Sequence, residues 1–94
     1  MPRQPRLTSR YLRAASRLGL TAGSVRGAAL ARTLRALLLA AELPGPADTR
    51  AVIPPTAEAY VRRVAGQNVW LWYRFDGSEV VLLSVTTEPP VPLD

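Results

Sequence analysis

The sequence contains no cysteine, no histidine and no lysine. Without cysteine it has no disulfide and no thiolate metal site, and without histidine it lacks the commonest metal ligand and the usual general base. These absences exclude most familiar catalytic arrangements, so we expect neither a metal nor a cofactor. The longest apolar run, Ala28–Leu43, is interrupted by Arg32 and Arg35, which argues against a membrane span. We therefore expect a cytoplasmic protein with no membrane contact.

Arginine is what the chain has in excess. All 12 of its cationic side chains are arginine, against seven acidic ones, which gives a net charge of +5. A net positive charge favours acidic or phosphate-rich partners. A chain of 94 residues is long enough for one modest core. We expect residues 1–94 to form a single domain, with an irregular start over residues 1–7 and a proline-rich tail over residues 88–94.

Three consecutive strands are predicted in the second half of the chain, at Tyr60–Val64, Val69–Phe75 and Val80–Val85. The first two are separated by a short loop with glycine and asparagine, and the last two by Asp76-Gly77, a dipeptide typical of tight hairpin turns. With these two as the turn residues, Phe75 faces Ser78 and Arg74 faces Glu79 across the hairpin.

Alternation along the middle strand separates its side chains into two faces. Val69, Leu71, Tyr73 and Phe75 share one face, and Trp70, Trp72 and Arg74 share the other. If helices cover the first face, the tryptophans need another cover, and we expect Trp70 and Trp72 to bind a partner protein. Two other interpretations stay open, in which the tryptophans belong to the core or stack on nucleic-acid bases.

Two helices are predicted before the strands. The first begins at a cap on Thr8 or Ser9 and runs to about Leu18, where Gly19 ends it. The second follows a cap on Ser24 and runs from Val25 to about Glu42. Its apolar residues include a leucine stripe that matches the area the sheet needs covered, at Leu30, Leu34, Leu37 and Leu38. Leu43-Pro44-Gly45-Pro46 ends the second helix, and Arg50–Ile53 is a candidate edge strand. The predicted fold is α+β, with an N-terminal helical hairpin packed on a three- to four-stranded antiparallel sheet.

The first helix carries a basic stripe. Arg6, Arg10, Arg13 and Arg17 are spaced by 4, 3 and 4 residues, which places them on one side of a helix that extends that far. The stripe is either a solvated face or a contact for an acidic partner. The candidates for binding a target or nucleic acid are all arginines: Arg10, Arg13, Arg17, Arg62, Arg63 and Arg74.

Two segments carry a resemblance to a known family. They read AYVRRVAG and WYRFDGSEVVLLSV, and with the helical hairpin before them they resemble the RelE/ParE superfamily of bacterial type II toxin–antitoxin toxins. The resemblance implies an α+β fold whose sheet packs on the helices, and a first strand near Gln4–Leu7, which in this sequence is short or missing. It also implies a cognate antitoxin as partner, and hence a hetero-oligomer.

Function divides within that family. RelE-like members are ribosome-dependent mRNA endonucleases, whereas ParE-like members poison DNA gyrase, so the implied target is either the ribosome with its mRNA or gyrase. Arg62 or Arg63 matches the first family arginine, but the second falls at Trp70 and is not matched. The last strand ends in Thr86-Thr87-Glu88 where the nucleases commonly have a basic group.

Metal-independent RNA cleavage needs a base, an acid and positive charge at the phosphate. Arg62, Arg63 and Arg74 supply only charge, while the candidate bases are Glu88 and Glu79 and the candidate acids are Tyr60 and Tyr73. Each of these has an ordinary structural role as well. The sequence therefore predicts a toxin that inhibits its target by binding. The alternatives are a metal-independent endoribonuclease with Arg62, Arg63, Arg74 and Glu88 as catalytic candidates, and a non-toxic module that binds nucleic acid or protein.

Overall fold

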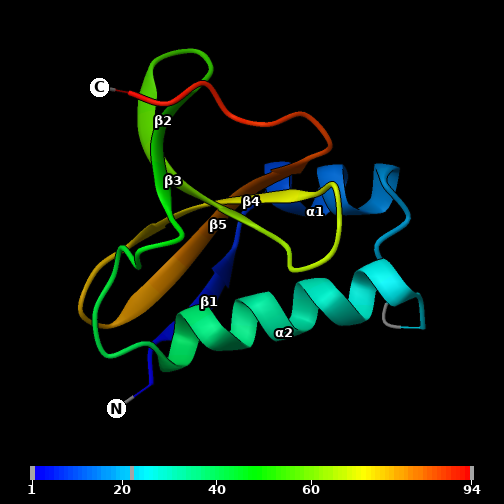
Figure 1. Ribbon diagram of the computed structural model, residues 1–94, viewed down its shortest axis with the longest axis horizontal. Coiled ribbons are helices and arrows are strands. Elements are labelled where there is room, and N and C mark those ends of the chain that lie inside the picture. The colour runs from blue at the N-terminus through cyan, green and yellow to red at the C-terminus, as the bar shows by residue number, and fades with distance from the viewer. Residues whose placement is uncertain (1, 22, 94) are drawn as a thin grey trace.

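A computed structural model describes residues 2–21 and 23–93, and its framework is a mixed β-sheet with two helices (Figure 1). The elements in chain order are β1 Gln4–Leu7, α1 Ser9–Arg17, α2 Val25–Leu39, β2 Thr49–Ile53, β3 Ala57–Arg63, β4 Trp70–Phe75 and β5 Glu79–Thr86. The sheet has five strands in the order β1-β5-β4-β3-β2. The α+β class is confirmed, but the prediction of a purely antiparallel sheet with three or four strands is wrong, because β1 adds a fifth strand and runs parallel to β5.

β1 lies where an irregular chain start was predicted. Gln4 pairs with Glu79 and Leu7 with Leu82. The prolines at positions 2 and 5 favour an irregular or extended start, and the structure has the extended form. Pro5 is tolerated because β1 is an edge strand, where one missing N–H can face away from the neighbour. The prediction of irregular structure over residues 1–7 is therefore wrong for Gln4–Leu7.

α1 begins and ends on the residues that the sequence indicated. The Thr8 side chain caps the helix by accepting the Tyr11 N–H, and the Thr8 hydroxyl also donates to the Leu82 carbonyl at 2.7 Å, which ties the helix start to β5. At the other end Gly19 has a φ of +67°. The Leu20 N–H donates to Ala15 O and the Gly19 N–H to Ser16 O, which is the Schellman arrangement that a left-handed glycine permits.

α2 begins at its Ser24 cap as predicted and ends earlier than predicted. Ala40 already has extended geometry, so the helix stops at Leu39 and not at Glu42. Leu30 and Leu37 are buried, and Leu34 and Leu38 are half-buried against the same core. The predicted leucine stripe therefore faces the sheet.

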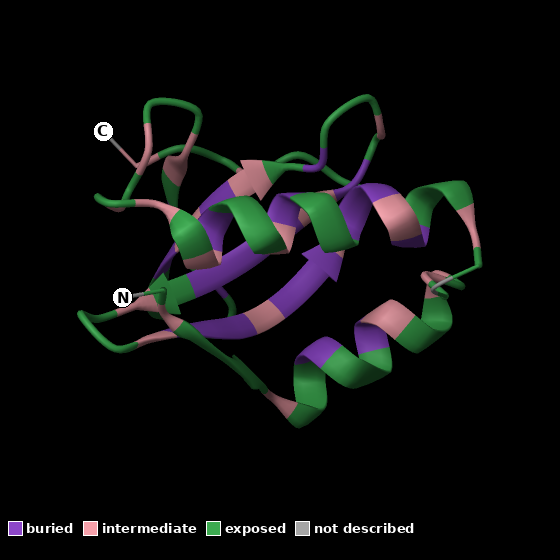
Figure 2. Ribbon diagram, turned by 90° about the horizontal axis from the view of Figure 1, so that it is seen from below, coloured by how far each residue is buried: buried purple, intermediate pink, exposed green. Residues whose placement is uncertain are grey.

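The main core lies between the helices and one face of the sheet (Figure 2). Leu71 and Tyr73 of β4, Val80 and Leu82 of β5, and Leu37 of α2 all have 0% exposure. Leu71 and Tyr73 belong to the face of β4 that was predicted to meet the helices, so that prediction is confirmed. A smaller cluster lies on the opposite face and consists of Ala51, Ile53, Ala59, Val61 and Trp72, with Trp70 and Leu83 packed against it.

The β4–β5 connection differs from the predicted two-residue turn. Phe75 pairs with Val80 and Arg74 with Val81, so the register is shifted by two residues from the predicted one. The Asp76 carboxylate accepts the backbone N–H groups of Ser78 and Glu79 and organises a longer loop. The predicted Arg74–Glu79 pair is therefore wrong. A shift of two residues keeps each side chain on its face, which is why the faces of β4 were still predicted correctly.

β5 contains an irregularity opposite Trp72 and Tyr73. Tyr73 pairs with Leu82 and Trp72 with Ser84, so Leu83 is an extra residue. The bulge lets both Leu82 and Val85 face the helices, because one extra residue reverses the alternation. After β5, the C-terminal segment returns along β2, where Pro92 bridges Ala51 and the Leu93 N–H donates to Arg50 O at 2.9 Å.

Within residues 2–21 and 23–93, neither helix combines the length and the apolar character that a bilayer crossing requires.

Candidate functional site

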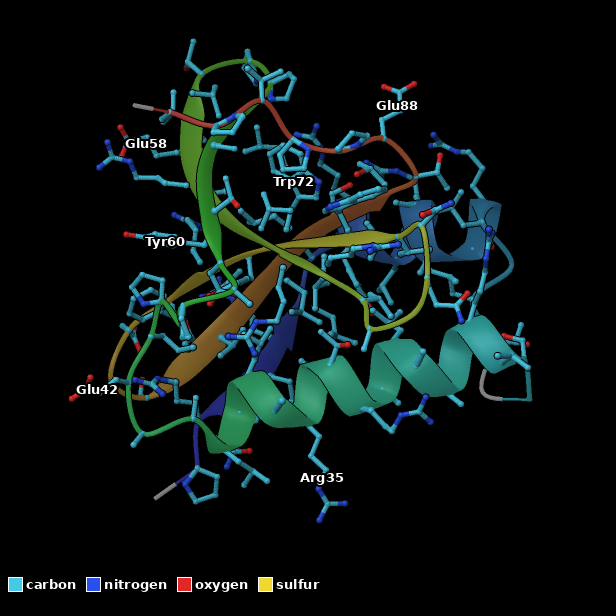
Figure 3. All side chains as sticks on the ribbon, in the orientation of Figure 1. Arg35, Glu42, Glu58, Tyr60, Trp72 and Glu88 are labelled. Carbon is cyan, nitrogen blue, oxygen red and sulfur yellow. The ribbon has the colours of Figure 1, made fainter. Side chains whose placement is uncertain are left out.

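A groove of about 610 Å³ runs between α1 and the C-terminal segment. We call it the C-terminal groove, and its lining comprises Arg10, Ala14, Arg17, Leu18, Val52, Pro54, Trp72, Val85 and the segment Thr86–Val91. Four residues that the sequence singled out meet here, namely Arg10, Arg17, Trp72 and Glu88. In Figure 3 the Glu88 side chain extends from the C-terminal segment away from the sheet.

One wall of the C-terminal groove is basic. Arg10 and Arg17 are seven residues apart on α1, which places them on the same side of the helix two turns apart. The Arg10 guanidinium donates to the Pro54 carbonyl at 2.7 Å and so connects α1 to the loop between β2 and β3. In the described part of the chain the ion pairs are Arg6–Glu79 and Arg62–Asp48, so no carboxylate pairs with Arg10 or Arg17 there.

The predicted four-arginine stripe is only partly present. Arg6 lies in β1 and bonds Glu79 at 3.3 Å, so it belongs to the sheet and not to the helix. Arg13 lies on α1 but does not line the C-terminal groove. Of the four predicted arginines, Arg10 and Arg17 line the C-terminal groove, and Arg13 is exposed on the same helix.

Trp72 contributes the base of the C-terminal groove and is covered mainly by its own chain. Its exposure is 8%, its indole N–H donates to the Thr86 hydroxyl at 3.0 Å, and that hydroxyl donates to the Glu88 carbonyl at 2.9 Å. This short series of hydrogen bonds fixes the indole and the start of the C-terminal segment together. Trp72 was expected to bind a partner because it would otherwise be uncovered, and in the structure its own chain already covers it.

Trp70 and Arg63 lie outside the C-terminal groove. Trp70 is half-buried, and the Arg63 guanidinium lies over its ring, 5.9 Å from the centroid. Arg63 also donates to Gln67 O and to the Asn68 side chain, so it holds the loop between β3 and β4. A partner-binding role for Trp70 stays a prediction.

A second cluster, which the sequence did not reveal, surrounds a buried carboxylate. We call it the Asp48 cluster, and its members are Asp48, Arg62, Tyr73 and Gly45. The Asp48 side chain is 0% exposed. It accepts two hydrogen bonds from Arg62, at 2.5 and 2.8 Å, one from the Tyr73 hydroxyl at 2.5 Å and one from the Gly45 N–H at 2.7 Å. Every oxygen of the carboxylate thus has a partner.

The electrostatics of the Asp48 cluster keep Arg62 and Asp48 charged and Tyr73 neutral. Burial alone raises the pKa of Asp48, but the hydrogen bonds from Arg62, Tyr73 and Gly45, together with the charge of Arg62, outweigh it and lower that pKa below its ordinary value. The hydrogen bond to Asp48 raises the pKa of Arg62. Burial, followed by the bond to Asp48, raises the pKa of Tyr73 far above its ordinary value.

These contacts give structural roles to several residues that were considered for chemistry. The charge of Arg62 is compensated by Asp48, and the Tyr73 proton is held on a hydroxyl with 0% exposure. Glu79, a candidate base, pairs with Arg6. One weak signal for the cluster is present in the sequence, where Asp48 is the only acidic residue between Glu42 and Glu58.

Arg74 is exposed on the face of the sheet that also carries Trp72. It lines a hollow of about 300 Å³ that shares Arg10 and Pro54 with the C-terminal groove. Arg74 and Tyr60 both line another hollow of about 320 Å³, and the half-buried Tyr60 ring lies 5.5 Å from that of Phe75. The structure thus brings Arg74 near the groove and leaves Arg62 and Arg63 in other surroundings.

No grouping of three or more potential metal-ligating side chains occurs in residues 2–21 and 23–93. No protein-family model matches the sequence, and neither a curated protein nor a solved structure matches the chain.

Proposed function

We propose that this chain is the toxin of a bacterial type II toxin–antitoxin pair, that it inhibits its target by binding, and that a cognate antitoxin neutralises it. The segments that carry the resemblance fall on β3 with its following loop and on the β4–β5 hairpin. A strand also occupies Gln4–Leu7, the place that the resemblance implies for a first strand. The arrangement of helices and strands is therefore compatible with the proposal.

The Asp48 cluster is the observation that carries the non-catalytic part of the proposal. Acid–base cleavage of RNA needs side chains that are free to accept or donate a proton at the reacting atoms. Arg62 is instead held by two hydrogen bonds to a buried carboxylate, and Tyr73 donates its hydroxyl proton to the same carboxylate. Arg63, Arg74 and Glu88 remain as catalytic candidates. They lie at the end of β3, on an exposed position of β4 and on the C-terminal segment.

Binding is supported by the charge distribution. Arg10 and Arg17 line a groove whose other surfaces are largely apolar, and the chain carries a net charge of +5. An acidic antitoxin segment suits such a surface, because opposite charges speed association and apolar contact lengthens the life of the complex. DNA gyrase is the target that a non-catalytic member of this family implies, and the cytoplasm is the compartment where gyrase would be met.

Induced expression in a bacterium tests the proposal. The chain is expressed alone and together with the product of any small reading frame adjacent to its gene, where an antitoxin would be encoded, while growth, transcript integrity and the DNA-damage response are followed together. We expect growth arrest that the neighbour relieves, a DNA-damage response and intact ribosome-bound mRNA. Normal growth at a verified protein level would refute the toxin assignment.

Cleavage of translated mRNA would identify the alternative, a ribosome-dependent endoribonuclease. Glu88→Gln is the informative variant for that outcome, because it removes the one candidate base that pairs with no arginine in the described part of the chain. Codon-specific cuts that disappear in Glu88→Gln, while ribosome binding persists, would replace the binding mechanism with catalysis.

A further inference from the structure

We infer that the C-terminal groove binds an acidic, partly apolar peptide segment of a partner protein. In this arrangement the carboxylates of the segment contact Arg10 and Arg17, and its apolar side chains cover the groove between Trp72 and the C-terminal segment. The inference rests on the proposed function only in taking the antitoxin as the source of that segment.

The groove is held in shape before anything binds. α1 is held in place by the Thr8 hydroxyl, which donates to the Leu82 carbonyl, and by the Arg10 guanidinium, which donates to the Pro54 carbonyl. The opposite wall is held by two hydrogen bonds. The Thr86 hydroxyl donates to the Glu88 carbonyl, and the Leu93 N–H donates to the Arg50 carbonyl. A preformed groove pays little ordering entropy on binding. Its volume of about 610 Å³ lies within the usual range for ligand sites.

The charges favour an acidic occupant on the α1 side. Arg10 and Arg17 have no carboxylate partner among the described residues, while the single acidic lining residue, Glu88, belongs to the opposite wall. A carboxylate entering beside α1 gains charge-assisted hydrogen bonds from guanidinium groups. The same carboxylate beside Glu88 is repelled, so the two walls orient the segment.

The apolar part of the lining favours a peptide over nucleic acid. Val52 and Val91 expose 39% and 82% of their surface at the groove, and an apolar side chain of the segment would cover them. Stacking of bases needs an open aromatic plane, whereas Trp72 is only 8% exposed. A peptide that combines leucine with glutamate matches both the valines and the arginines.

Tryptophan fluorescence provides a local probe. The chain has two tryptophans, so the Trp70→Phe variant reports on Trp72 alone. The ligand is a capped peptide of alternating leucine and glutamate, and its controls are the same peptide with glutamine for glutamate and with serine for leucine. We expect saturable binding of the first peptide, which weakens with salt, and little binding of either control.

Matched arginine variants locate the site. Arg17→Ala and Arg10→Ala should each weaken binding by about tenfold. Arg17→Ala is the cleaner of the two, because the Arg17 side chain makes no hydrogen bond or ion pair with the described residues, whereas Arg10 donates to the Pro54 carbonyl. Arg35→Ala is the control, since Figure 3 shows this side chain pointing from α2 away from the sheet. It should bind as the parent does, and Glu88→Gln should bind more tightly because a repulsive charge is removed.

Several results would overturn the inference. These are equal losses in Arg35→Ala and Arg17→Ala, equal binding of the serine-for-leucine peptide, and an oligouridine that competes with the same dependence on Arg17. The last result would indicate a nucleic-acid site. The proposed function fails separately, because unimpaired growth on expression would refute the toxin while leaving the peptide groove intact. Antitoxin binding that is indifferent to Arg10, Arg17 and Trp72 would refute the groove and leave the toxin.

Discussion

Asp48 and Arg62 form a buried, doubly hydrogen-bonded ion pair that connects the loop after α2 to β3. The Asp48 side chain is 0% exposed and that of Arg62 is 17% exposed. Gly45 lies against the pair, because a Cβ at that position would be only 2.6 Å from the Arg62 guanidinium. The loop sequence is thus constrained by the ion pair.

Asp48→Ala should be among the most destabilising single substitutions in the chain. It leaves Arg62, the Tyr73 hydroxyl and the Gly45 N–H without their acceptor, and breaking a buried pair in this way costs about 3–5 kcal/mol. Urea unfolding measures the free energy. Glu58→Ala, an exposed acidic residue on β3, is the control and should change it by less than about 0.5 kcal/mol. Equal effects of the two substitutions would show that the pair does not stabilise the fold.

The Asp48 cluster also predicts acid sensitivity. Because the folded pKa of Asp48 is lowered from its ordinary value of 3.8, its stabilisation is present above pH 3.8 and is lost as the pH falls through the lower folded pKa. The free energy of unfolding should therefore decrease with acidification in that range. In Asp48→Asn this decrease should be smaller, with the remainder coming partly from Asp76, whose pKa is lowered by backbone hydrogen bonds from Ser78 and Glu79. An identical pH profile for Asp48→Asn would contradict the expectation.

Gly27→Ala should destabilise the protein, although alanine is favoured over glycine in helices by about 1 kcal/mol. A Cβ on Gly27 would lie 1.7 Å from the carbonyl oxygen of Thr21 and 2.9 Å from the Ser24 hydroxyl, so the loop before α2 would have to move. The thermal midpoint should fall. Gly23→Ala serves as the comparison, because a Cβ there meets no atom within 4 Å. A midpoint for Gly27→Ala at or above that of the parent would show that the loop adapts freely.

Leu37→Ala tests the packing of α2 on the sheet. Leu37 has 0% exposure, so its truncation leaves a cavity that costs about 2–5 kcal/mol. Leu39, two residues further along the helix, is 59% exposed, and Leu39→Ala should change the urea midpoint only slightly. Comparable losses for both would contradict the observed face of the helix.

Local signals in the sequence predicted local structure well. The caps at Thr8 and Ser24, the left-handed Gly19 and the two faces of β4 all depend on residues within a few positions of one another. The longer β4–β5 loop was missed because the Asp76 side chain satisfies the turn by accepting backbone N–H groups, which a dipeptide rule based on positive φ does not include.

The missed features all depend on distant partners. β1 exists because β5 supplies its hydrogen bonds, and nothing in Gln4–Leu7 itself indicates that pairing. Asp48 lies in a loop with no periodic pattern, so the sequence does not indicate its pairing with Arg62 and Tyr73. That pairing depends on how the loop lies against β3 and β4. The C-terminal groove likewise needed the path of the last residues, which proline composition alone does not give.

The position of β5 has a consequence for synthesis of the chain. Because β1 pairs in the sheet with β5 alone, it has no neighbouring strand until Glu79–Leu82 have been made. The anchoring of α1 to the sheet waits as well, since the Thr8 hydroxyl donates to the Leu82 carbonyl. The groove is thus complete only after β5 and the C-terminal segment have been made, and a nascent chain that stops before them carries no finished binding surface.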